Sequence, residues 1–274
     1  MPMPEIIDRL HQVYVRKRLR SRRCAPTQSF GVVAYAPHRT ASMFIFKLFR
    51  DLSMDRGVSF FSANNSPPNH DQLTSDINSS FCVAPVRSFT FRTHFENIGQ
   101  IKNVVQIRDP RDIVVSEYFS LAYSHPDKSW PAEQKLARDT VRSMTVDEYA
   151  LSVIEDNNPA LRLSKYSLKH RLLELLPAIA ADATIVRYED MVRNYGQWLT
   201  AVIGVFEFGE CSSSVHRRYY RKYNHVFRPP ETEDIYAHKR SILPGNHRIH
   251  LSRESVEALN EQFAGFLARY GYQS

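Results

Sequence analysis

The expected fold is decided by the stretch Val104-Val105-Gln106-Ile107-Arg108-Asp109-Pro110-Arg111-Asp112-Ile113-Val114-Val115-Ser116. Residues 104–107 are mostly apolar and β-branched, which favours an interior strand. Asp109 is a good helix N-cap, Pro110 suits the first helical position, and an acidic residue follows three places after the cap. The stretch therefore predicts a buried strand, a turn, and a helix that packs on a sheet.

An arginine stands where this strand meets the helix. Arg108, Asp112 and Ser116 are spaced by four, so they share one side of the helix entrance. An arginine can bind a phosphate through two parallel hydrogen bonds, and a serine hydroxyl can add another. The spacing therefore indicates an anion site, and it is equally compatible with an Arg–Asp pair that only ties the strand to the helix.

The composition is that of an ordinary globular chain. Its 274 residues are 43% hydrophobic and 24% charged, which suffices for a sizeable core. No run approaches the roughly 20 apolar residues of a membrane span, and acidic and basic residues interrupt the N-terminus where a signal peptide would be apolar. Three scattered cysteines indicate a reducing compartment rather than a disulfide framework or a zinc site. We therefore expect a cytoplasmic protein.

The formal net charge of +7 favours an anionic partner. Much of it lies in residues 16–23, after an amphipathic stretch that includes Ile6, Leu10 and Val13. Such a segment could touch acidic lipid or nucleic acid, but a solvated surface helix that ends in a basic arm is the simpler interpretation.

Strand-like and helix-like segments alternate along the chain. We expect strands at 30–35, 58–62, 81–84, 88–91, 104–107 and 182–187, and helices at 41–52, after 110, over most of 124–182, after 187 and at 253–270. This alternation predicts an α/β fold, a single domain over 1–274 with a central parallel sheet flanked by helices. Within it we expect an N-terminal amphipathic helix and basic arm at 1–28, a core at 29–252, and a C-terminal packing helix at 253–274.

The loop after the first expected strand is a natural phosphate cradle. It reads Ala36-Pro37-His38-Arg39-Thr40-Ala41-Ser42-Met43-Phe44, and the start of a helix points backbone N–H groups at a ligand. Arg39, Thr40 and Ser42 would add side-chain donors. The loop lacks the GxxxxGK[ST] pattern of nucleoside triphosphatases, and a plain polar turn remains an alternative.

Together these segments resemble the soluble 3′-phosphoadenosine 5′-phosphosulfate (PAPS)-dependent sulfotransferases, in family order over roughly residues 30 to 252. The loop at 36–44 is similar to the family's phosphosulfate loop P-[KR]-S-G-[ST]-T-W, with Ala41 at the glycine and Phe44 at the tryptophan. Residues 91–95 resemble the family's K-T-H-L stretch, and 108–116 resemble its 3′-phosphate motif R-[ND]-P-[RK]-D-x-x-x-S. Residues 186–190 resemble its late Y-E-D, and 238–248 resemble its terminal loop H-x-R-x-G-x-x-G-D-W-[KR].

The resemblance implies a P-loop-nucleotide-kinase-like sulfotransferase fold and an enzyme that moves a sulfuryl group from PAPS to a hydroxyl or amine, with PAP as the product and no metal. It implies His94 as general base, Arg39 as an electrostatic clamp on the 5′-phosphate and bridging oxygen, and Arg92 as a group that steadies the sulfuryl group or only pairs with a surface acid. The implied cofactor-binding residues are Arg39, Thr40, Ala41, Ser42, Phe44, Arg108, Ser116, Tyr188, Arg240 and Gly245.

Some of these positions have a second interpretation. Phe44 would stack on adenine, and Tyr188 would face the nucleotide, but either aromatic ring could instead belong to the core. Alanine at 41 would be strained if the loop needs a positive φ there. In the terminal loop, Ile242, Asn246 and His247 replace the family's glycine, aspartate and tryptophan.

The acceptor is not identified by the sequence. We expect a small molecule or glycan, with no nucleic acid partner, and leave the oligomeric state open. Aromatic residues that could line its pocket, or equally form core, are Tyr123, Trp130, Tyr219, Tyr220 and Phe227. The alternative functions are a nucleotide or small-molecule kinase on a related fold, and a non-catalytic relative that binds nucleotides or nucleic acid.

Overall fold

The computed structural model describes residues 30–63, 80–87, 100–124, 131–159, 167–229, 234–236 and 240–273. The expected N-terminal helix and arm at 1–28 and the expected strand at 88–91 lie outside these residues. The chain divides into two compact units, residues 1–107 with 179–224 and residues 108–178 with 225–274. The expectation of a single domain stays a prediction, and each unit is described by itself below.

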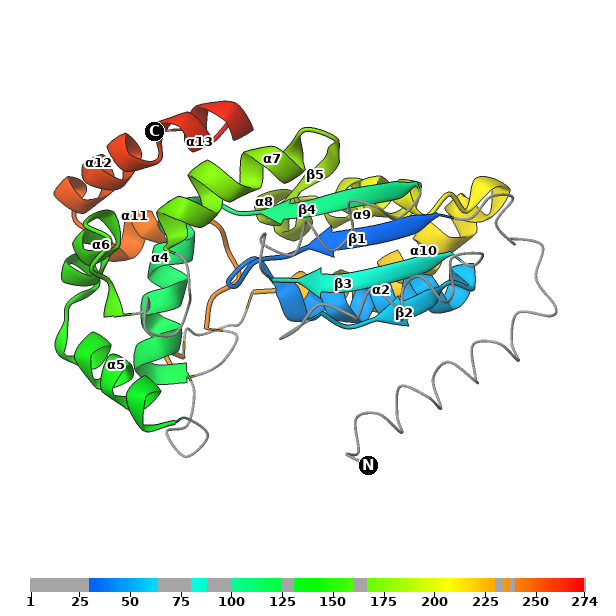
Figure 1. The fold of residues 1–274 in the computed structure, drawn as a ribbon. Coiled ribbons are helices and arrows are strands. Elements are labelled where there is room, and N and C mark those ends of the chain that lie inside the picture. Colours follow the sequence, from blue (N-terminus) through cyan, green and yellow to red (C-terminus); the bar gives the residue numbers. More distant parts are fainter. Residues whose placement is uncertain are drawn as a thin grey trace. The chain divides into compact units, whose positions relative to one another are not determined.

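The first unit is built on a five-stranded sheet (Figure 1). Its strands are β1 (Gly31–Tyr35), β2 (Ser59–Phe61), β3 (Phe81–Val86), β4 (Ile101–Ile107) and β5 (Ala183–Arg187). Their order is β2-β3-β1-β4-β5, and every neighbouring pair is parallel. The predicted α/β class with a parallel central sheet is therefore confirmed.

The centre of the sheet is buried because its strands are apolar. Every residue of β1 and β3 is buried, as expected for interior strands of a parallel sheet. Gly31 lets these two strands pack, because a Cβ at this position would collide with the Phe81 ring. The one polar residue in the buried half of β4, Gln106, accepts a hydrogen bond from the Trp198 indole at 3.1 Å. The buried Gln106 side chain thus obtains its hydrogen-bond partner, Trp198, from a distant part of the sequence.

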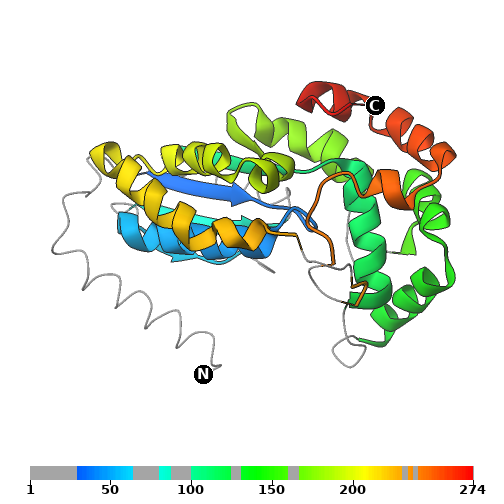
Figure 2. The same ribbon diagram turned by 180° about the vertical axis from the view of Figure 1, so that it is seen from behind.

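Helices of the first unit cover the face of the sheet that Figure 2 shows. They are α2 (Ser42–Arg56), α8 (Tyr188–Arg193), α9 (Tyr195–Val205) and α10 (Ser212–Tyr223), with a short 3₁₀ turn η7 (Gly209–Cys211) before α10. Helix α2 packs on β2 and β3, α9 packs on β4 and β5, and α10 packs on α9. Hydrogen bonds also join α2 to α10. Asp51 of α2 accepts them from Lys222 and Tyr223 of α10.

The second unit is helical in its described residues. Its elements are α4 (Pro110–Phe119), the π-helical turn η3 (Ser120–Ser124), α5 (Ala132–Ser143), α6 (Val146–Ile154), the π-helical η6 (His170–Leu175), α11 (His247–His250), α12 (Arg253–Gln262) and α13 (Ala264–Tyr270). Two short elements, α7 (Leu176–Ala180) and the 3₁₀ turn η8 (Asn224–Phe227), run across the unit boundaries. Helices α6 and α11 pack on α4, and α12 packs on α6.

Two sequence expectations need correction. The C-terminal helix is two helices, because the backbone leaves helical geometry at Phe263, whose buried ring belongs to the core. Cys211 is disulfide-bonded, whereas the sequence indicated a reducing compartment rather than a disulfide framework, and Cys82 is a buried free thiol. In the described part of the chain, no helix has both the length and the apolar character that a membrane span requires.

Candidate functional site

The second unit begins with the predicted helix entrance. The Asp109 side chain caps α4 by accepting a hydrogen bond from the Arg111 N–H at 2.9 Å, and Pro110 is the first helical residue, as predicted. The Arg111 guanidinium folds back on the same carboxylate and also donates to Asn260 at 2.6 Å. Arg111 therefore holds the helix start in place.

Arg108 and Arg240 form a cluster of two nearly buried arginines. Arg108 is 4% exposed and Arg240 is 7% exposed, although they are 132 positions apart in the chain. Burial and the neighbouring charge of Arg108 lower the pKa of Arg240 to about 10, and Asp112 only partly opposes this. Two guanidinium groups that repel each other out of water favour an anion between them. The sequence predicted both residues as cofactor ligands, and the structure brings them together.

Several contacts fix the direction of the Arg240 side chain. Its guanidinium lies 4.1 Å from the centre of the Phe119 ring and donates to the Asn246 side-chain oxygen at 3.1 Å. A second nitrogen lies 3.0 Å from Nε2 of His250. An arginine held over an aromatic ring and by two polar partners has few rotamers left, so little entropy is lost when it binds an anion.

Asp112 organises the loop that carries Arg240. It is fully buried, and its two oxygens accept hydrogen bonds from the Gly245 N–H at 2.8 Å, the His247 N–H at 3.0 Å and His247 Nδ1 at 2.7 Å. Burial by itself would raise the pKa of Asp112, but the His247 side chain, Arg108 and the two backbone N–H groups outweigh it and bring the pKa down to about 2. Arg108 approaches the same carboxylate at 3.9 Å, the predicted i,i+4 pair.

These contacts show what two residues of the terminal loop do. Gly245 was predicted as a phosphate ligand, but its N–H donates to Asp112, and its φ of 99° is a conformation that suits glycine. Its contribution in the structure is thus to shape the loop. His247, which stands where the resembled family has tryptophan, adds a side-chain hydrogen bond to the same carboxylate. Ser116 lies on α4 two turns beyond Arg108 and is half-buried.

Sequence reasoning missed three members of this cluster. Phe119, Asn246 and His250 all contact Arg240, yet none was predicted as a site residue. Phe119 lies in the predicted helix at a position of the apolar pattern. Its spacing is therefore that of a core residue and gave no sign of a contact with Arg240. Asn246 lies within the family-like loop and His250 lies two residues beyond it, where the distances depend on how the loop folds.

The first unit carries the predicted phosphosulfate loop between β1 and α2. Arg39 has a φ of 71° and Ala41 a φ of 68°, so two residues with side chains adopt the left-handed conformation in one short connection. The expectation that alanine is strained at 41 is therefore confirmed. Thr40 is buried and donates its hydroxyl to the Pro37 carbonyl at 2.7 Å, while Arg39 is half-buried.

Other predicted residues of the first unit are buried. Phe44 is 9% exposed and packs edge-on against Tyr195 and Tyr223, which is the core alternative for this ring. Ser42 begins α2 and is buried, and Tyr188 begins α8 and is also buried. Tyr219, considered for the acceptor pocket, donates its hydroxyl to the Asp51 carbonyl and the Asp55 side chain, each at 2.9 Å, so it belongs to the α2–α10 packing.

The predicted catalytic residues His94 and Arg92 lie outside the described residues, as does Trp130. No group of three or more potential metal ligands occurs among the residues that are described.

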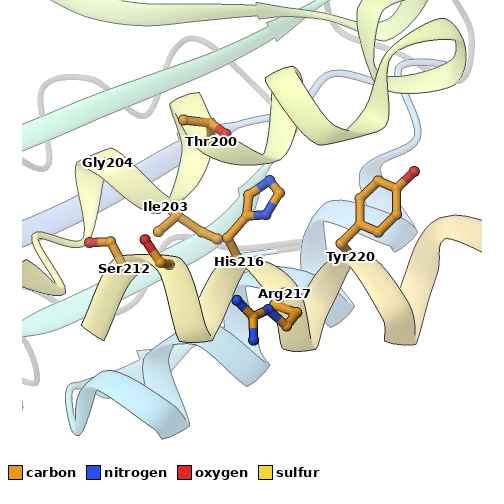
Figure 3. Close-up of a pocket in the computed structure, with 8 residues that line it drawn as sticks. Thr200, Ile203, Gly204, Ser212, His216, Arg217 and Tyr220 are labelled. Carbon is orange, nitrogen blue, oxygen red and sulfur yellow. The ribbon is translucent and has the colours of Figure 1, made fainter. Parts of the chain in front are cut away.

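A pocket of about 600 Å³ lies between α9 and α10 of the first unit (Figure 3). Its lining includes Thr200 and Ile203 of α9 and His216, Arg217 and Tyr220 of α10. Nε2 of His216 lies 2.9 Å from the Gly196 carbonyl oxygen, so this nitrogen donates a hydrogen bond to α9. Of the aromatic residues considered for acceptor binding, Tyr220 is on its wall.

The comparisons with known proteins agree with the fold. No model of a known protein family matches the chain, and no curated protein matches it in sequence. Among solved structures, the crystal structure of mouse sulfotransferase SULT7A1 complexed with PAP matches with a TM-score of 0.59 and 10% sequence identity, over 89% of this chain and 86% of that chain. At this identity the likeness establishes a sulfotransferase-like fold.

Proposed function

We propose that this protein is a sulfotransferase that uses PAPS to sulfate a hydroxyl or amine of a small molecule or glycan. The observation that carries the proposal is the buried pair of Arg108, just before α4, and Arg240, in the loop before α11, on a fold similar to that of a sulfotransferase complexed with PAP. Their mutual repulsion suits a phosphate dianion, and the 3′-phosphate distinguishes PAPS from ordinary adenylates.

The residues divide between the two phosphate groups of the cofactor. Arg108, Arg240 and Ser116 would hold the 3′-phosphate in the second unit. The loop before α2 would hold the 5′-phosphosulfate, with Arg39 and Ser42 as donors at the helix start and Thr40 fixing the loop through its hydroxyl bond to Pro37. A metal is not part of this proposal, because arginine guanidinium groups supply the positive charge that a phosphoryl-transfer enzyme draws from magnesium.

The proposed chemistry is an in-line transfer, for which PAPS supplies the sulfuryl group and the leaving phosphate. His94 takes the proton of the acceptor as the bond from acceptor oxygen or nitrogen to sulfur forms. The bond from sulfur to the bridging oxygen breaks, and its electron pair stays on that oxygen. Arg39 holds a permanent positive charge against the developing charge there, because its guanidinium does not release a proton, and Arg92 steadies the sulfuryl oxygens.

The test is calorimetry of the purified protein with 3′,5′-adenosine bisphosphate (PAP) and no magnesium. We expect the wild type to bind, and Arg108→Ala to bind at least about tenfold more weakly, since a charge-assisted hydrogen bond contributes roughly 1.5–3 kcal/mol. The matched control is Arg253→Ala, whose arginine is exposed on α12 and pairs with nearby Glu257 at the surface. This control should bind PAP like the wild type.

Two results would overturn parts of the proposal. If the wild type does not bind PAP, the cofactor assignment fails; if Arg108→Ala binds as tightly as the wild type, the role of the arginine pair fails. The same titration with ATP and Mg²⁺ tests the kinase alternative, because a kinase should prefer that ligand. Binding of DNA or RNA with a steep salt dependence would instead favour a nucleic-acid-binding relative.

A further inference from the structure

His250 of α11 contacts the arginine cluster through the nitrogen that can gain or lose a proton. Its Nε2 lies 3.0 Å from a terminal nitrogen of Arg240. Because a guanidinium has N–H donors and no acceptor, Nε2 must accept this hydrogen bond. The imidazole is therefore neutral in this arrangement, with its proton on Nδ1. Protonation of Nε2 would break the hydrogen bond and bring two cations face to face.

The groups around His250 come from several elements. From α4, the Phe119 ring meets the imidazole edge-on at 4.9 Å, and Asp112 contributes a negative charge. Arg240 faces His250 from the loop and is itself influenced by the charge of Arg108, and His247 and Arg248 belong to α11 itself. Burial and the Arg240 charge lower the pKa of His250, and Asp112 partly offsets them. The balance of charge around this imidazole is thus set by the arginine cluster.

We propose that His250 is a proton-linked cation of the phosphate site: when Arg108 and Arg240 hold a phosphate or sulfate dianion, His250 takes up a proton from solvent and becomes a third positive charge beside it. The inference rests on the proposed function only in treating the arginine cluster as an anion site. The dianion neutralises the positive charge that keeps His250 neutral, and it accepts the Arg240 hydrogen bonds that Nε2 gives up.

The direction of the pH effect follows from linkage. The pKa of His250 lies below its ordinary value in the free protein and rises when the dianion binds, so binding takes up a proton between these two pKa values. The affinity for the anion should therefore increase as the pH falls through the bound-state pKa, and level off below the free-state pKa. Sulfate is the right probe, because it remains a dianion throughout the range in which histidine titrates.

The experiment follows the His250 ring signal by nuclear magnetic resonance from about pH 5 to pH 8, a range that spans ordinary histidine titration. Spectra are recorded without ligand, with saturating sulfate and with saturating PAP. We expect either anion to raise the pKa of His250 by about one unit, and the affinity for sulfate to rise about tenfold over this range. An unchanged His250 pKa in the presence of a bound anion would overturn the proposal.

Matched variants assign the effect to His250. His250→Gln keeps an acceptor for Arg240 but cannot be protonated, so its sulfate affinity should be nearly independent of pH. His170→Gln removes a histidine of η6 that pairs with Glu174, and it should keep the wild-type pH dependence. If His250→Gln also keeps that dependence, the linked proton belongs to another group and the proposal is wrong.

The outcomes separate the two proposals. Sulfate binding with a raised His250 pKa, but no PAP binding, would support the proton linkage and reject the sulfotransferase function. PAP binding with an unmoved His250 pKa would reject the linkage and leave the sulfotransferase function standing. If neither anion binds, both proposals fail.

Discussion

At the scale of single residues, Asp112 does the most to shape the arginine cluster. A carboxylate inside an anion site opposes ligand binding by its charge, so its presence there needs a structural reason. That reason is its four contacts: three hydrogen bonds fix the loop of Gly245 and His247, and the fourth contact, to Arg108, joins that loop to the helix entrance. Asp112 thus lowers the net positive charge of the site, while its contacts fix the loop that carries Arg240.

Replacing Asp112 by asparagine tests this role through stability. The folded-state pKa of about 2 lies below the unfolded value of about 4, so the ionised carboxylate stabilises the fold above pH 4, and this stabilisation is lost as the pH falls through 2. Asp112→Asn should lower the free energy of unfolding by about 2–3 kcal/mol at pH 7 and by roughly half as much at pH 3. Urea denaturation at the two pH values measures both differences.

The control for this experiment is Asp182→Asn, a change at an exposed aspartate in the turn before β5. It should alter the free energy of unfolding by no more than about 0.5 kcal/mol at either pH. A loss for Asp112→Asn that is the same at pH 7 and pH 3 would mean that the side chain stabilises the fold by its shape rather than by its charge.

At the scale of elements, the connection from β1 to α2 combines the local strain with the proposed chemistry. Helix α2 starts at Ser42 after a left-handed Ala41 that offers no side-chain acceptor to the first N–H groups. A phosphosulfate could accept hydrogen bonds from N–H groups at such a helix start. The strain at Ala41 is thus located in the segment to which we assign the cofactor.

Ala41→Gly tests whether this backbone conformation is costly. Glycine adopts a φ of 68° without steric penalty, so the variant should raise the free energy of unfolding by about 0.5–1 kcal/mol. The matched change Ala201→Gly, at an exposed position within α9, should lower it by a similar amount, because glycine disfavours a helix interior. Chemical denaturation of both variants measures the two effects, and a loss of stability in Ala41→Gly would contradict the assigned strain.

The elements themselves were largely predictable because their signals are local. The apolar run and the N-cap at Asp109 predicted that a strand ends and a helix begins here, and the structure has β4 and α4 at these positions. The break at Phe263 was not predictable, because the apolar spacing continues through this buried residue. Gln106 likewise needs Trp198, a residue 92 positions away, to explain a polar side chain in a buried strand.

The candidate site was predictable only where a motif named its residues. Arg108 and Arg240 were predicted from motif-like segments as ligands of one cofactor. In the folded second unit the charge of Arg108 acts on Arg240, which agrees with that prediction. The hydrogen bond from Arg240 to His250 had no sequence signal, since an i,i+10 spacing across a loop has no fixed geometry. The core position of Phe44 depends on aromatic rings of α9 and α10, so it too required the fold.

At the scale of the whole molecule, the proposed reaction draws on residues throughout the chain. Anion binding is assigned to Arg108 and Arg240, the clamp to Arg39, and proton transfer to His94. A group that only moves a proton contributes to the rate and not to the affinity for PAP, whereas an anion-binding group contributes to both. Binding and transfer should therefore respond differently to substitutions at these positions.

His94→Ala separates the two functions. We expect it to bind PAP within about twofold of the wild type and to lose at least about 100-fold in transfer rate, because general base catalysis typically contributes a factor of 10² or more. The measurement is transfer of labelled sulfuryl groups from PAPS to a panel of phenols, alcohols and amines. His225→Ala, at an exposed histidine of η8, should keep wild-type transfer. Undiminished turnover by His94→Ala would reject His94 as the base, whereas loss of PAP binding would make it a cofactor ligand instead.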